Sequence, residues 1–196
     1  MRWDRFFDDL EDQIASEWEA ERAALATEAE RLQRSGLSLR ERLTAVQGVS
    51  AAVDLADGTA VAARVRAVGA DWVGLDLDDT PRRALVVPFA SIRSIGMPHA
   101  DLLRSARPAG TAPDRLAERQ TFGYVLRDVA RRRIGVTIRL TGERLLTGTI
   151  DRAGADHLDL AVHEPGEARR ADAVTAHRVV PSWAIVWVRL EARLEY

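Results

Sequence analysis

The sequence predicts a mainly β protein with some helix, in which two five-stranded small barrels follow a long N-terminal helix. One observation is an internal repeat, because the apolar pattern of residues 53–77 recurs 85 positions later (138 − 53). The pattern of residues 86–95 recurs 93 positions later (179 − 86), so the second copy carries an insertion of eight residues (93 − 85). The other observation is the alternation of apolar and polar residues in short runs, which is typical of strands with one wet face.

The repeat divides the chain into five segments. We expect an amphipathic helix over 1–35, a first barrel over 38–97, a basic linker over 98–120, a second barrel over 121–190 and a tail over 191–196. Asp57 and Gly58 favour a tight hairpin after the first strand. The strands are predicted at 51–56, 61–68, 72–77, 83–87 and 91–95, and again at 134–140, 145–153, 157–163, 178–180 and 184–190.

A short helix is expected before each barrel. Ser38 and Glu41 have the spacing of a capping box, and Gly48 suits the end of the helix that they begin. Before the second barrel, an apolar stripe that includes Val125 and Val129 is followed by three arginines at 131–133. Cationic side chains in a last helical turn interact favourably with the helix dipole.

The N-terminal helix is predicted from apolar residues that recur at steps of three, four and seven. Over about 32 residues it would be about 48 Å long, longer than one small barrel. It therefore crosses both barrels, pairs with another helix or projects, and the aromatic residues near its start could also dock in the groove of a partner. The residues of the stripe are Trp3, Phe7, Leu10, Ile14, Trp18, Leu25 and Leu32.

This order of elements resembles the Sm-like (LSm) fold, a member of the SH3-like small barrels. Residues 53–58 with 69–75 resemble the first motif of that family, and residues 86–95 resemble the second. The resemblance implies two Sm-like barrels. RNA-binding Sm proteins share an Asp-x-x-x-Asn loop, but here Leu75 and Leu160 stand where that Asn is expected. The resemblance therefore implies the fold more than a ligand.

Composition limits the class of protein. The chain has 196 residues, no cysteine and a net charge of −2, which excludes disulfides and thiolate metal sites. No apolar run reaches the ~20 residues of a membrane-spanning helix, and the N-terminus lacks the apolar stretch of a secretion signal. We therefore expect a cytoplasmic protein with no membrane partner. Lysine and asparagine are absent, which indicates a GC-rich, bacterial gene rather than selection for arginine.

The sequence contains no recognisable catalytic constellation. It has no phosphate-cradling glycine-rich loop and no serine in an elbow motif near a histidine. Three histidines and an aspartate could bind a metal ion, namely His157, His163, His177 and Asp159. Outward-facing residues of this kind on a strand are more commonly just solvated. We therefore predict no enzyme activity, no cofactor and no metal.

Two functional hypotheses remain. The first is a non-enzymatic protein-interaction or oligomerisation module that uses the N-terminal helix and the edge strands of the barrels. Its predicted interface residues are Trp3, Phe7, Leu10, Ile14, Trp18, Trp72 and Trp187. The alternative is an RNA- or DNA-binding regulator of Sm-like type, supported by a net charge of +4 over residues 100–135 (8 − 4) against −5 over residues 1–34 (5 − 10). Its predicted phosphate contacts are Arg64, Arg66, Arg127, Arg131, Arg132 and Arg133.

Overall fold

The computed structural model describes residues 18–19, 22–23, 36–78, 84–107, 120–166, 170 and 173–191. Residues 18–19 and 22–23 are helical, and the Trp18 side chain is exposed. The other apolar residues of the predicted N-terminal stripe, which include Trp3, Phe7, Leu10 and Ile14, lie outside the described residues.

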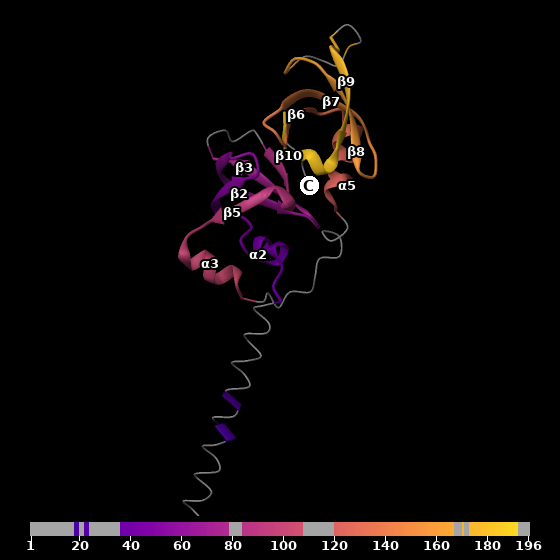
Figure 1. Cartoon of the computed structure of the whole chain (residues 1–196). Coiled ribbons are helices and arrows are strands. Elements are labelled where there is room, and N and C mark those ends of the chain that lie inside the picture. Colours follow the sequence, from indigo (N-terminus) through magenta and orange to yellow (C-terminus); the bar gives the residue numbers. More distant parts are fainter. Residues whose placement is uncertain are drawn as a thin grey trace, which may run out of the picture.

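Within the described residues, each half of the chain contains five strands and one 3-10 turn in the same order, together with short helices (Figure 1). The first half contains α2 (Leu39–Ala45), β1 (Ser50–Leu55), β2 (Ala60–Val68), β3 (Trp72–Leu77), β4 (Ala84–Pro88), η1 (Phe89–Ser91), β5 (Ile92–Gly96) and α3 (His99–Ser105). The second half contains α5 (Phe122–Arg131), β6 (Gly135–Leu140), β7 (Leu145–Ala153), β8 (His157–Val162), β9 (Ala176–Pro181), η2 (Ser182–Ala184) and β10 (Ile185–Leu190).

All ten strands belong to one antiparallel sheet, in the order β5-β1-β2-β3-β4-β10-β6-β7-β8-β9. The prediction of two separate five-stranded barrels, and with it the tandem Sm-like fold class, is therefore wrong. The physical reason is that β4 pairs with β3 on one side and with β10 on the other, so it does not close a barrel within its own half. In the β4–β10 ladder Val86 lies opposite Val188 and Leu85 opposite Arg189. β10 pairs with β6 on its other side, so it is an interior strand of the sheet.

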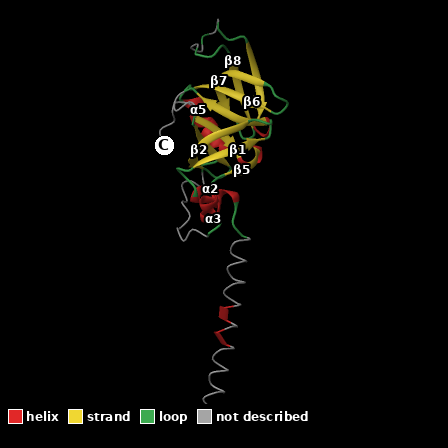
Figure 2. Cartoon of the chain, turned by 90° about the vertical axis from the view of Figure 1, so that its left-hand side faces the viewer, coloured by secondary structure: helices red, strands yellow, loops and turns green. Residues whose placement is uncertain are grey.

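The internal repeat is preserved in the strand order and in the bulges. Each half has the order last-first-second-third-fourth, and the two halves meet where the fourth strand of one adjoins the last strand of the other. A bulge follows Val65 in β2 and Ile150 in β7, at matching positions of the repeat. Bulges increase local bend and twist, and the strands are strongly curved in Figure 2.

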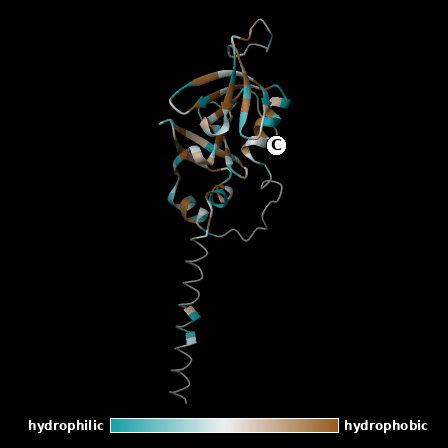
Figure 3. Ribbon diagram, turned by 45° about the vertical axis from the view of Figure 1, so that its right-hand side comes forward, coloured by the Kyte–Doolittle hydropathy of each residue, from teal (hydrophilic) through white to brown (hydrophobic). Residues whose placement is uncertain are grey.

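Two hydrophobic clusters form the core, and each takes residues from the other half. Trp72 and Val86 of the first half pack in the cluster of the second half, whereas Val186 of β10 packs in the cluster of the first. Figure 3 shows apolar and polar residues interspersed along the strands. At the junction, β4 supplies both clusters, with Val86 in one and Leu85 and Val87 in the other. The halves are therefore joined by shared packing as well as by the β4–β10 ladder.

The corner between β2 and β3 holds the start of α5. The Trp72 indole Nε1–H donates to the Gln120 carbonyl at 2.7 Å, and an Asp71 carboxylate oxygen accepts from the Phe122 N–H at 2.6 Å. A Cβ atom at Gly69 would overlap the Trp72 ring, which explains why glycine stands there. α5 in turn contacts β7 and α2 contacts β2, so each helix covers its own half.

The predicted local signals are confirmed at two places. Ser38 and Glu41 form the complete capping box of α2, and their hydrogen bonds lower the pKa of the Glu41 carboxyl. Gly58 follows β1 with a φ of 80°, the left-handed conformation that the predicted Asp57-Gly58 hairpin turn requires.

An ion pair also crosses the junction. Arg139 Nε lies 2.8 Å from Asp57 Oδ2, and the Asp57 side chain has no exposed surface. Burial by itself would raise the pKa of Asp57, but hydrogen bonds from Thr59 and Arg139 outweigh it and hold that pKa below its ordinary value. The pair links the β1–β2 turn of the first half to β6 of the second.

Asp57→Asn should lower the free energy of unfolding by about 1–3 kcal/mol at neutral pH, because it removes a buried charged acceptor. The folded-state pKa of Asp57 is lowered, so its contribution is present above the ordinary pKa of 3.8 and is lost as the pH falls through the folded-state pKa. Urea unfolding against pH measures this. Asp101→Asn, in a partly exposed pair with Arg104, is the matched control, and an equal loss in both variants would contradict the assignment.

Trp72→Ala should destabilise the protein by about 3–5 kcal/mol, because it empties a fully buried site shared by both halves. Trp72→Phe keeps most of the ring but loses the bond to Gln120, so we expect a loss of about 0.5–1.5 kcal/mol. Chemical denaturation followed by circular dichroism measures both. Trp183→Phe changes an exposed ring and should shift stability by less than about 0.5 kcal/mol; similar losses at both positions would refute the junction role of Trp72.

Candidate interaction surface

The outermost strands of the sheet are β5 and β9. Within the described residues, β5 pairs only with β1 and β9 only with β8. The outer side of such a strand presents unpaired N–H and C=O groups, which form a template for another strand. These two edges are the candidate functional surface of the molecule.

The repeat shows which buried positions are uncovered at the edges. β9 is the counterpart of β4, and β5 is the counterpart of β10. Val86 in β4, which pairs with Val188 of β10 and packs in the core cluster of the second half, is 3% exposed, whereas its counterpart Val179 in β9 is 69% exposed. Val188 in β10 is buried, whereas its counterpart Ile95 in β5 is partly exposed. The difference follows from position in the sheet, because the interior strands have a neighbour that the edge strands lack.

The β5 edge is bordered by an apolar groove of about 240 Å³. The groove lies between strand β5 and the helices α2 and α3. The two helices contact each other. Leu39 and Leu102, on its rim, are among the exposed large apolar residues of the described chain. Its principal apolar lining residues are Leu39, Leu43, Ile92, Ile95, Met97 and Leu102.

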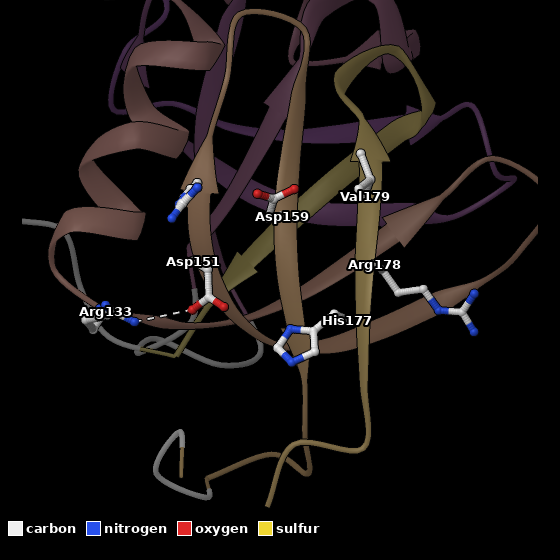
Figure 4. A pocket seen from close by; sticks show the side chains of 7 residues that line it. Arg133, Asp151, Asp159, His177, Arg178 and Val179 are labelled. Atoms are coloured by element: carbon white, nitrogen blue, oxygen red, sulfur yellow. Dashed lines mark hydrogen bonds and ion pairs between the residues drawn. The ribbon is translucent and has the colours of Figure 1, made fainter. Parts of the chain in front are cut away.

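The β9 edge carries exposed apolar side chains beside polar ones. Trp183, in the 3-10 turn η2 that follows β9, is 81% exposed. A polar hollow of about 410 Å³ lies against this edge and is drawn in Figure 4. There Arg133 reaches Asp151 at 3.3 Å, and Arg178 points away from the carboxylates. The charges of the hollow are therefore partly balanced within the chain.

The predicted interface tryptophans lie in different environments. Trp72 is buried at the junction between the halves, so it presents no outer surface. Trp187 is partly buried against the core cluster of the first half, and its Nε1–H has no hydrogen-bond partner in the described structure. Trp18 is exposed. Val179 and Trp183 fall outside the predicted set, and the signal that identifies Val179 is its alignment with Val86 in the repeat.

The predicted phosphate-contacting arginines are exposed, but most are engaged within the chain. Arg64 donates to the Gly48 carbonyl at 2.6 Å, and Arg127 donates to the Gly154 carbonyl at 3.4 Å. Arg66 is exposed on β2. At the end of α5 the remaining three gather around carboxylates, with Arg131 and Arg132 on Asp128 and Arg133 on Asp151.

The histidines do not converge. His163 is buried, with Nε2 lying 2.9 Å from Thr149 Oγ1, whereas His157 lies exposed with Nδ1 2.8 Å from Asp156 Oδ1. The bond to His157 lowers the pKa of the Asp156 carboxyl. His177 lines the polar hollow on β9. Within the described residues no group of three potential ligands is close enough to hold a metal ion.

Among the described residues, no helix is both long and apolar enough to cross a membrane. No protein-family model matches the sequence, and no curated protein matches it either. The edges of the sheet and the geometry of the internal junction are therefore the features that indicate a function.

Proposed function

We propose that the protein is a non-enzymatic interaction module that associates with other protein chains through its two sheet edges. The observation that carries this proposal is the exposure of Val179 on β9, because its counterpart in β4, Val86, pairs with a neighbouring strand and is buried in a core cluster. An edge that exposes a core-type residue is suited to strand addition, in which main-chain hydrogen bonds supply affinity and side-chain pockets supply specificity.

The apolar residues near the edges provide a driving force. Covering a Val or Leu side chain fully contributes about 1.5–3 kcal/mol. Val179 and Trp183 lie at one edge, and the groove with Leu39 and Leu102 lies at the other. Arg93 and Arg178 keep both edges partly polar, a feature that limits indiscriminate edge pairing. This combination suits a specific contact.

Nucleic-acid binding receives less support from the contacts. The arginines at the end of α5 already hold the carboxylates of Asp128 and Asp151. The net charge of −2 also opposes approach to phosphates. Binding of this kind would weaken steeply with added salt, because phosphate contacts release counterions. The interaction-module hypothesis is therefore the one that we put forward.

The proposal predicts that the 196-residue chain forms particles heavier than its monomer mass of 21.7 kDa at tens of micromolar. Val179→Glu should shift it to the monomer, because the substitution places a charge where the β9 edge must be covered. Light scattering coupled to size-exclusion chromatography measures this. Leu145→Glu is the matched control, since Leu145 is half-exposed on an interior strand. A wild-type protein that stays monomeric throughout this range would overturn the proposal.

A further inference from the structure

We infer that the partner at these edges is a second copy of the same chain, with β9 of one copy pairing antiparallel to β5 of the next. The inference rests on the proposed function, since it names the occupant of the same two edges. Its basis is the internal junction, in which the fourth strand of one half already pairs with the last strand of the other. β9 is the fourth strand of the second half and β5 is the last strand of the first half. Neither has the neighbour that β4 and β10 provide for each other.

The internal junction also specifies the register. β4 and β9 are related by an offset of 93 positions (179 − 86), and so are β5 and β10 (188 − 95). Replacing each residue of an internal β4–β10 pair by its counterpart therefore gives the expected intermolecular β9–β5 pair. The internal pair Val86 with Val188 becomes Val179 with Ile95. In the same way, Leu85 with Arg189 becomes Arg178 with Gly96, and Ala84 with Leu190 becomes His177 with Met97.

The side chains are compatible with this register. Val179 opposite Ile95 is a pair of β-branched residues, a favourable cross-strand combination. Gly96 opposite Arg178 leaves space for the guanidinium stem and places no cation against it. Ile95 also lines the apolar groove beside α2, so the incoming β9 would lie along the rim of that groove. The contact would therefore cover apolar surface at both edges.

Polar replacements make this contact weaker than the internal one. His157 stands in the position of Trp72, and Arg93 in the position of Val186. Gly142 replaces Asp57, so the intermolecular junction has no counterpart of the Asp57–Arg139 ion pair. We therefore expect a ladder like that of the internal junction with less buried apolar area, and hence a reversible association. Because the two edges differ, a dimer keeps one free edge of each kind and association continues beyond two copies.

Cysteine cross-linking of the full chain tests both the partner and the register. The sequence has no cysteine, so Ile95→Cys and Val179→Cys are introduced into separate, differently tagged proteins and mixed under mild oxidation. Opposed Cα atoms of antiparallel strands are about 4.5–5.5 Å apart, within the range of a disulfide. Met97→Cys mixed with Val179→Cys is the out-of-register control, since its diagonal spacing of about 7–8 Å is too long.

The expected result is a cross-linked heterodimer in the Ile95→Cys and Val179→Cys mixture, at least about tenfold above the out-of-register mixture and above each variant alone. The pair Met97→Cys with His177→Cys should behave likewise and guards against a local folding defect. Cross-linking of Val179→Cys alone as fast as the mixture would overturn the inference, because it shows β9 pairing with β9. Oligomeric wild-type protein without either heterodimer would also overturn it while leaving the proposed function intact.

Discussion

The pairing of β4 with β10 is the contact on which the rest of the structure depends. It makes one sheet of two repeated units and brings Trp72 and Val86 of the first half into the core of the second. It also determines which strands lie at the edges. β5 and β9 are the counterparts of β10 and β4 in the repeat, and they have no such partner in the described structure. The candidate surface is thus a consequence of the junction.

The two halves differ in the side chains at the internal junction and at the corresponding positions of the sheet edges. At the internal junction the side chains are an indole, a valine and a buried ion pair, represented by Trp72, Val186 and Asp57 with Arg139. At the edges the corresponding positions hold an imidazole, an arginine and a glycine, namely His157, Arg93 and Gly142. The backbone arrangement repeats while the apolar area is reduced. In physical terms, the same kind of ladder joins the two halves inside the chain and, in the proposed assembly, would join one chain to the next.

The sequence predicted local structure well and strand partners poorly. Alternation located the strands, and the Ser38–Glu41 capping box was predicted correctly, because both depend on residues close together in the chain. Alternation shows which face of a strand is buried but not which strand lies beside it, so the joining of β4 to β10 was missed. Trp72 alternates outward from its own half, yet the other half covers it. The exposure of Val179 likewise depends on a missing neighbour, which only the repeat reveals.

Amide hydrogen exchange of the wild-type protein, measured at low micromolar concentration, tests the central claim most directly. If β4 and β10 join the halves, their amides are expected to exchange at the rate of global unfolding, as interior strands do. The outward amides of β5 and β9 should exchange far faster. Exchange in β10 as fast as in β5 would contradict the account, because it would mean that the two halves are not held in one sheet.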